Sequence, residues 1–318
     1  MMRKKIVVFG GGTGLSNLLS GLKEYPVDIT AIIAVSDTGS STGKLREEFH
    51  IPAVGDIRKT ITSLSSVPSS IKEMLEYRFQ TTSDLNGHAL GNLMLLSLLQ
   101  TTGSLKNAIL ALSDLLSIEH KVLPLSESST ITLMAQMNDR QIVEGEENIT
   151  TYPSSVQRLF YKEEPTIVPE VIEAISEADL LVFSMGSLYT SVLPHLLSSK
   201  IIEAIDKSSA PLMYVCNIVT QPGETDRFSV GDHVKLLNQY LGNRKLDVVI
   251  ASNSKISQEL IEKYSIQEQK QPVLIDYDVL SSYDIELIEA DLLNVEQQRL
   301  RHDNQKLSFL IFSYLMRW

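Results

Sequence analysis

The beginning of the chain alternates short apolar runs with polar segments that contain glycine. Residues 6–9 are apolar and mostly β-branched, which is typical of a buried parallel strand, and residues 29–35 have the same character. Residues 16–24, between these runs, have apolar positions at helical spacing. This order of strand, helix and strand predicts a βαβ unit, and therefore a parallel sheet with right-handed crossovers.

The middle of the chain has a different pattern. Apolar positions recur there at helical spacing and no convincing strand is expected, so the pattern predicts a helical insertion at about residues 56–120. The expected helices cover residues 56–65, 70–79, 90–101 and 105–116. Short β-like runs follow at 122–125, 131–135 and 141–143, and they predict a small antiparallel accessory sheet.

The alternation of strands and helices returns in the second half. Further strands are expected at residues 180–183, 211–216 and 248–251, and further helices at 192–205, 230–241 and 303–316. The whole pattern predicts a single α/β domain over residues 1–318. Its core is expected to be a doubly wound, mostly parallel, Rossmann-like sheet with an inserted helical subdomain and a small accessory β region.

Composition narrows the class of protein. The chain has 318 residues, 43% of them hydrophobic, and a net charge of −11, which argues against a general nucleic-acid or membrane surface. Cys216 is the only cysteine and is expected to be buried at the end of a strand, so neither an intrachain disulfide nor a multi-cysteine metal site is expected. No apolar run approaches the roughly 20 residues that span a bilayer. The run after residues 2–5, Met-Arg-Lys-Lys, is too short for a signal peptide. A cytoplasmic protein is therefore expected.

The segment 10–16, Gly-Gly-Gly-Thr-Gly-Leu-Ser, directly follows the first expected strand. Glycine lets the backbone turn sharply and approach a phosphate, and the free N–H groups of a helix start point at such an anion. The segment therefore predicts a phosphate-binding turn and a nucleotide-like ligand, the alternative being a turn whose glycines serve packing alone. Gly10 and Gly12 match the dinucleotide fingerprint, but Leu15 occupies its third glycine position, which argues against an NAD-dependent dehydrogenase.

Polar loops that contain glycine follow four of the expected strands. In open parallel sheets, ligands bind beyond the carboxyl ends of the strands, so these loops are expected to converge on one crevice. The four loops are residues 10–16, 36–46, 184–191 and 217–225. Their shared position in the fold is a stronger argument for a ligand site than any one of them alone.

Several residues of the first half could contact a ligand. Asp37 could bind a ribose, could be the carboxylate of a metal or phosphate site, or could close an Asx turn. Asp56 is expected to be a capping carboxylate at a helix start. His88 could act in acid–base chemistry or as a structural hydrogen-bonding group, and Asn86 and Asn92 could orient a ligand. The hydroxyl and basic side chains suited to phosphate oxygens are Ser40, Ser41, Thr42, Lys44 and Arg46.

The second half offers three more candidates. Residues 186–191 repeat the theme of strand, glycine, hydroxyl and helix, which predicts a second anion site or a capping serine. Ser187 does not stand in a G-x-S-x-G elbow, so an α/β-hydrolase nucleophile is not expected. The acidic loop 220–226 could bind base or sugar hydroxyls, and Arg301 could clamp a pyrophosphate or pair with Asp303.

Taken together, these strings resemble those of the YvcK-type gluconeogenesis factor family, the bacterial branch of the CofD-like superfamily, nearly from end to end. The strings are GGGTGL (10–15), SSTGKLR (40–46), PAVGDIRK (52–59), GHALGNL (87–93), GSLYTS (186–191), TQPGETD (220–226) and LRHD (300–303). The resemblance implies a cytoplasmic protein that binds UDP-sugars such as UDP-N-acetylglucosamine. It also implies a role in growth, cell shape and cell-wall precursor supply on gluconeogenic carbon sources.

The resemblance implies a regulatory protein rather than an enzyme, because no reaction is established for this branch. The alternative follows from the related CofD-type enzymes, which are metal-dependent 2-phospho-L-lactate transferases that use a nucleotide-diphosphate-type donor. In that case Asp37 would ligate Mg²⁺, and Asn92 or His88 would orient the acceptor. A third interpretation is a vestigial crevice in a protein that acts through partners alone. The partner expectations are a nucleotide-sugar ligand, a homodimer and cell-wall synthesis proteins.

Site residues follow from the resemblance position by position. The diphosphate would lie on Gly11, Gly12, Thr13 and Gly14, and it would face Arg301. The rest of the pocket would be formed by Asp37, Asn92, Gly186, Ser187, Leu188 and Tyr189. The sequence departs from the family pattern at Thr38, where relatives usually have a second aspartate, and at Met185, where they usually have proline.

Overall fold

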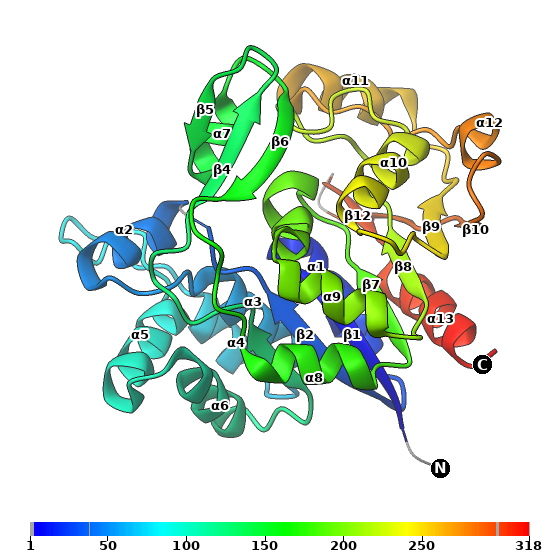
Figure 1. Cartoon of the computed structure of the whole chain (residues 1–318). Coiled ribbons are helices and arrows are strands. Elements are labelled where there is room, and N and C mark those ends of the chain that lie inside the picture. The colour runs from blue at the N-terminus through cyan, green and yellow to red at the C-terminus, as the bar shows by residue number, and fades with distance from the viewer. Residues whose placement is uncertain (1–2, 38, 297–298, 318) are drawn as a thin grey trace.

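The computed structural model describes residues 3–37, 39–296 and 299–317, except for the side chain of Ser40 (Figure 1). Its centre is a seven-stranded sheet in the order β10-β9-β8-β7-β1-β2-β3, in which every neighbouring pair is parallel. The strands are β1 (Lys4–Gly10), β2 (Val27–Ile33), β3 (Lys121–Pro124), β7 (Leu180–Phe183), β8 (Leu212–Val215), β9 (Val248–Ser252) and β10 (Glu286–Ala290). The predicted doubly wound parallel sheet is confirmed.

The order of strands reverses between β1 and β7. From β1 the chain proceeds outward through β2 and β3 on one side, and from β7 through β8, β9 and β10 on the other. Such a reversal leaves a crevice at the carboxyl ends of the two central strands, which is where open sheets bind ligands. The glycine turn that ends β1 and opens α1 (Gly12–Leu22) lies at this point.

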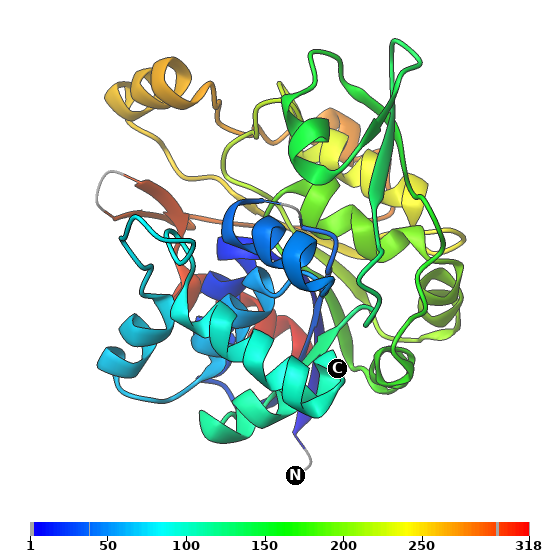
Figure 2. The same cartoon turned by 90° about the vertical axis from the view of Figure 1, so that its left-hand side faces the viewer.

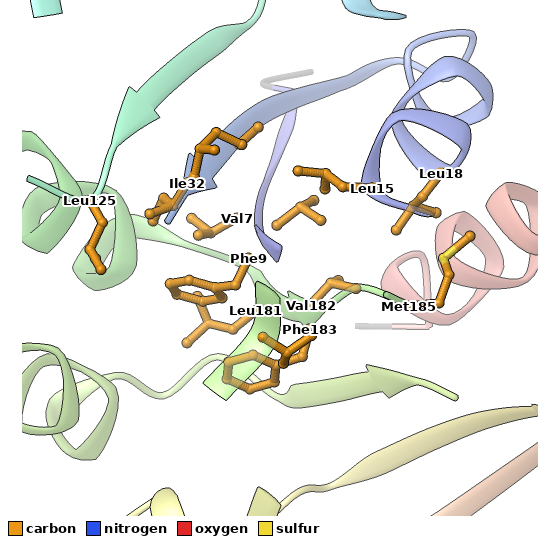
Figure 3. Close-up of a cluster of buried hydrophobic side chains, with 14 of the residues drawn as sticks. Val7, Phe9, Leu15, Leu18, Ile32, Leu125, Leu181, Val182, Phe183 and Met185 are labelled. Carbon is orange, nitrogen blue, oxygen red and sulfur yellow. The ribbon is translucent and has the colours of Figure 1, made fainter. Parts of the chain in front are cut away.

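The core forms where these central strands meet. Phe9 of β1 pairs in register with Phe183 of β7, and their rings stack with centroids 5.1 Å apart. Leu15 and Leu18 of α1 are fully buried near the same strands, on the side away from the two rings (Figure 3). On its outer side α1 packs against α13 (Asn304–Leu315), close to the predicted final helix 303–316. The first and last helices of the chain therefore lie side by side, with the start of α13 against the second half of α1 (Figure 1).

The predicted helical insertion is present beside this sheet. Its helices are α3 (Gly55–Leu64), α4 (Ser69–Glu76), α5 (Leu90–Thr102) and α6 (Leu105–Leu115), which pack on one another (Figure 2). The prediction of a loop over residues 36–46 is wrong from residue 40 onward, because α2 (Ser40–Phe49) begins there. Its sequence has little helical periodicity, and burial of Thr42 and Leu45 supplies the packing that stabilises the helix.

The accessory sheet is antiparallel, as predicted, in the order β5-β4-β6. Its strands are β4 (Leu133–Met137), β5 (Ile142–Glu144) and β6 (Val156–Tyr161), with α7 (Glu146–Thr151) between the last two. The assignment of residues 122–125 to this sheet is wrong, because β3 pairs with β2 at the edge of the central sheet. A four-residue apolar run fits either sheet, and β6 was not predicted at all.

The second half has the predicted alternation of strands and helices, except that one predicted helix is divided into three segments. Instead of one helix over 192–205, the chain forms a π-helical turn, η1 (Leu188–Val192), a 3₁₀ segment, η2 (Leu193–Leu197), and α9 (Ser199–Lys207). Pro194 cannot donate a backbone hydrogen bond, which explains the break. The remaining elements are α8 (Pro169–Glu177), α10 (Val230–Tyr240), α11 (Gln258–Glu268), α12 (Tyr277–Leu280), β11 (Leu293–Glu296) and β12 (Arg299–His302).

Two smaller predictions can also be compared with the structure. Cys216 directly follows β8 and is 1% exposed, so the prediction of a buried cysteine at a strand end is confirmed. Among the described residues, no helix has both the length and the apolar character that crossing a bilayer requires.

Candidate functional site

A polar cavity of about 280 Å³ lies at the carboxyl ends of β1 and β2. Its walls come from the β1–α1 turn, the segment after β2, α2, α3, α5, α7 and η1, so residues far apart in the sequence meet there. Predicted residues in its lining include Gly12, Asp37, Ser41 and Asn92. Three of the four predicted loops, 10–16, 36–46 and 184–191, therefore reach one cavity, which agrees with the expected convergence.

A larger groove of about 660 Å³ lies at the other end of the strands, between α6 and α8. Its rim is formed by ion pairs such as Lys106–Glu170, with Nζ and Oε1 2.7 Å apart, and Lys5–Glu177, with Nζ and Oε2 2.6 Å apart. It contains neither a glycine turn nor any of the predicted site residues. Because ligands of open sheets bind at the carboxyl ends of the strands, the smaller cavity is the candidate site.

The first glycine turn already has an anionic partner inside the protein. The Gly12 N–H donates to Oδ2 of Asp56 at 2.7 Å, and Lys59 Nζ lies 2.9 Å from Oδ1 of the same carboxylate. A Cβ atom at Gly11 would lie only 2.6 Å from Asp56 Oδ2, so this contact requires a residue without a side chain. The prediction that Asp56 is a capping carboxylate is correct in chemistry, but the helix whose start it contacts is α1 rather than its own α3.

The next two residues of the turn differ from each other. Thr13 is exposed, and among the described residues no side chain accepts a hydrogen bond from the Thr13 or Gly14 N–H. Gly14 also has a packing role, because a Cβ there would lie 2.2 Å from the backbone oxygen of Met185. The turn thus combines one N–H occupied by Asp56 with neighbouring N–H groups that point out of a helix start.

Asp37 and Arg46 hold the segment after β2 in place. Asp37 Oδ1 accepts from the Gly39 N–H at 2.7 Å, which is the predicted Asx turn. Arg46 donates to the carbonyl oxygens of Ser36, Asp37, Ser129 and Ile131, at 2.9 to 3.3 Å. Arg46 therefore joins this segment to the loop before β4, and the prediction that it binds phosphate is not supported. Lys44 points to solvent, and Thr38 lies outside the described residues.

The cavity contains more carboxyl groups than the sequence suggested. Burial raises the pKa of Asp37, and the negative charge of Asp56 adds to the rise. Glu146 of α7 also faces the cavity, and burial followed by repulsion from Asp37 raises its pKa to about 8. Glu146 was not predicted, because its only local signal is a glycine before it, Gly145, with φ 88°. Among the described residues, no group of three potential ligand side chains is arranged to hold a metal ion.

Two of the predicted catalytic candidates form a buried network with Ser41. Ser41 Oγ lies 2.9 Å from His88 Nδ1, and Asn92 Nδ2 donates to the same oxygen at 3.3 Å. Asn92 lines the cavity, whereas His88 lies behind Ser41 and outside the lining. His88 therefore orients Ser41 in this arrangement and does not itself contact a ligand in the cavity. Asn86 instead accepts from the Thr81 N–H on the surface.

The polar groups of the turn after β7 already have hydrogen-bond partners within the protein. The Gly186 N–H donates to Asn217 Oδ1 at 2.9 Å, and Asn217 Nδ2 donates to the Gly186 carbonyl at 2.7 Å. Ser187 Oγ accepts from the Thr190 N–H at 3.0 Å and donates to Glu224 Oε2 at 2.5 Å, so the expected capping serine is present. Burial raises the pKa of Glu224 to about 7.

The remaining predicted residues lie in different surroundings. Leu188 and Tyr189 are 0% and 5% exposed, so they are part of the core beneath the turn and present little surface to a ligand. Arg301 is on β12, opposite Asn294 of β11, and is not in the described lining of the cavity. The alternative of an ion pair with Asp303 is not found either, because Asp303 Oδ2 contacts Lys306 Nζ at 3.5 Å.

Comparison with known proteins agrees with this architecture. A family model described as 2-phospho-L-lactate transferase CofD matches residues 6–293. The chain is 41% identical to a gluconeogenesis factor of Bacillus subtilis, over 98% of each chain, and 40% identical to one of Halalkalibacterium halodurans, over 97% of this chain and 95% of the relative. The crystal structure of a UPF0052 family member from Bacillus halodurans superposes with a TM-score of 0.94 at 39% identity, covering 97% of this chain and 99% of that one.

Proposed function

The chain belongs to the CofD family, as one of its gluconeogenesis factors, and we propose on this premise that it is a regulatory protein that binds a UDP-sugar of the UDP-N-acetylglucosamine type. The diphosphate would lie against the first glycine turn, with the uridine in the crevice and the sugar toward the 217–225 loop. Its role would be in growth, cell shape and cell-wall precursor supply on gluconeogenic carbon sources, in the cytoplasm.

The observation that carries this proposal is the first glycine turn at the point where the strand order reverses. The Thr13 and Gly14 N–H groups lie at the start of an eleven-residue helix, where the helix dipole favours a negative charge. Thr13 is exposed and can add a hydroxyl donor. Asp56 already occupies the Gly12 N–H, so the diphosphate would use the following N–H groups or displace this carboxylate.

Titration calorimetry with UDP-N-acetylglucosamine, UDP-glucose, NAD and GTP tests this function, with and without Mg²⁺. We expect only the UDP-sugars to bind, and to bind without metal. Thr13→Ala should weaken this binding by about 1–2 kcal/mol, because a hydroxyl bond to a charged phosphate oxygen is lost. Thr102→Ala, at an exposed threonine at the end of α5, is the matched control. Unchanged affinity in Thr13→Ala would contradict the placement, and no binding of any UDP-sugar would contradict the function.

A metal-dependent transferase is the second candidate, and the cavity's carboxyl groups favour it. Asp37 and Asp56 line the same cavity as Gly12, and their mutual repulsion contributes to the raised pKa of Asp37. Asp37 would hold a Mg²⁺ ion, which would neutralise phosphate charge, and Asn92 would orient the acceptor. Turnover of a nucleotide-diphosphate donor that disappears in Asp37→Asn would support this candidate. Absence of turnover with all acceptors tried would exclude it.

A further inference from the structure

Part of the lining of the candidate cavity has polar atoms that no described protein group satisfies. This part, here called the Arg58 pocket, is formed by Ser41, Arg58, Arg78 and Asn92. Arg58 and Asn92 are each only 1% exposed, and Arg58 Nε and Asn92 Oδ1 are buried without a hydrogen-bond partner among the described residues. Buried polar atoms without partners are costly, so a pair of them in one cavity points to a ligand.

Close contacts hold the side chains of Arg58 and Asn92 in place. The stem of Arg58 passes so close to α5 that a Cβ at Gly91 would lie 2.8 Å from Arg58 Cδ. The guanidinium NH1 pairs with Glu76 and leaves Nε inside. Asn92 is held by its amide hydrogen bond to Ser41, which His88 orients in turn. Gly91 and Asn92 belong to the string GHALGNL, so the sequence feature and the unsatisfied atoms coincide.

The chemistry of the unsatisfied atoms defines the ligand class. Arg58 Nε–H is a donor and requires an acceptor oxygen, whereas Asn92 Oδ1 is an acceptor and requires a donor. Arg78 adds a positive charge to the lining, whereas the charge of Lys59 is already paired with Asp56, whose Oδ1 lies 2.9 Å from Lys59 Nζ. Asp37 and Glu146 add carboxyl groups to the same lining. One anionic group therefore fits beside Arg58 and Arg78, while further phosphates would meet the carboxyl groups.

We propose that the Arg58 pocket binds a second, small ligand that carries one anionic group and a neighbouring hydroxyl group, either a phosphate monoester or a hydroxycarboxylate. The anionic oxygen accepts from Arg58 and the hydroxyl donates to Asn92. This ligand is separate from the UDP-sugar of the proposed function, because none of the Arg58 pocket residues belongs to the glycine turn. Asn92, which the resemblance assigns to the UDP-sugar pocket, is assigned here to the smaller ligand. The protein would then sense, or join, a nucleotide-sugar and a small hydroxylated acid.

Calorimetry and thermal-shift measurements on the full chain test this pocket with three probes: glycerol 3-phosphate, glycerate and glycerol. We expect saturable binding of glycerol 3-phosphate or glycerate at millimolar concentration and none of glycerol, and the anion that binds more tightly identifies the source of the charge. No saturable binding of either anion would overturn the proposal, and so would equal binding of glycerol, because that outcome would show no recognition of charge.

Variants then locate the site. Asn92→Asp should weaken binding about tenfold, since it places a carboxylate next to the anion. Arg78 lies on the exposed rim, so Arg78→Gln keeps the fold and should weaken binding several-fold. Arg140→Gln changes an exposed arginine in the β4–β5 turn and is the matched control. Equal loss in Arg78→Gln and Arg140→Gln, or none in either, would overturn the placement. UDP-N-acetylglucosamine titrated into Arg78→Gln tests the two sites separately, because its affinity should stay unchanged.

Discussion

The two glycine turns of this protein, after β1 and after β7, have similar sequences and different surroundings. Both follow a buried strand and combine glycine with hydroxyl residues before a helical segment. After β1, Thr13 is exposed beside a polar cavity, whereas after β7 the Gly186 amide bonds to Asn217 and Ser187 bonds to Glu224. A glycine turn is therefore an anion site only where the surrounding structure leaves its N–H groups accessible.

The two turns also touch each other, and that contact gives the largest expected effect. Gly14→Ala would drive a Cβ to 2.2 Å from the Met185 carbonyl oxygen, so we expect unfolding free energy to fall by about 3 kcal/mol. Gly103→Ala is the control, because Gly103 has φ 72° but open space around it and should cost about 1 kcal/mol. Urea denaturation measures both. A smaller loss in Gly14→Ala than in Gly103→Ala would show that the two turns do not press on each other.

A substitution at Asn217 tests whether hydrogen bonds to the glycine turn after β7 stabilise the fold. Asn217→Ala removes both hydrogen bonds to Gly186 and should lower the unfolding free energy by about 2 kcal/mol. The exposed Asn253 provides the control, and Asn253→Ala should change stability by less than about 0.5 kcal/mol. If Asn217→Ala kept full stability and lost affinity for UDP-N-acetylglucosamine, the second turn would be a ligand site and the comparison would fail.

A substitution at Asp56 tests whether the N–H groups of the glycine turn after β1 are accessible to an anionic ligand. Asp56→Asn removes the negative charge next to the Gly12 N–H, so affinity for UDP-N-acetylglucosamine without metal should rise about tenfold. Asp114→Asn removes the same charge from an exposed position on α6 and should leave the affinity unchanged. Calorimetry measures the difference. A fall in affinity would indicate that the carboxylate assists the phosphates through a cation, which favours the transferase candidate.

The carboxyl groups around the first turn predict a pH dependence, which for each pH unit is smaller than the effects above. The folded-state pKa of Glu146 is raised from 4.5 to about 8, so its protonated form stabilises the fold. This stability is complete below about pH 4.5 and is lost as the pH rises through about 8, at about 1 kcal/mol per pH unit between about pH 6 and 8. Glu146→Gln should remove this slope.

The neighbouring Glu147 is exposed, so Glu147→Gln is the control and should keep the slope of the wild type. Burial lowers the pKa of His195 and His302 to about 4 and raises the pKa of Glu224 to about 7, and the contribution of these groups is the same in all three proteins. The difference between the variants therefore isolates Glu146. Parallel pH profiles in Glu146→Gln and wild type would show that the accessory sheet does not bring a shifted carboxyl group to the cavity.

Much of the fold could be predicted because it depends on local patterns. The apolar runs that form β1, β2, β7, β8 and β9 are buried wherever they pair, so their order alone indicates a parallel sheet. The predictions were wrong where the local pattern allowed two outcomes. The run at 122–125 fits an accessory sheet or a central edge, and α2 has a polar sequence whose helix depends on contacts with other elements.

The candidate site could likewise be predicted only in part. The sequence by itself determined that a glycine turn follows the first strand, because Gly11 and Gly14 permit close approaches and Gly12 adopts a φ of 67°, which other residues rarely do. Only the tertiary structure decided what lies against that turn. Asp56 contacts Gly12 across 44 residues, Glu146 comes from helix α7 beside the accessory sheet, and Arg58 Nε has no partner among the described residues. Electrostatic contacts depend on distances in space, and the packing of whole elements sets those distances.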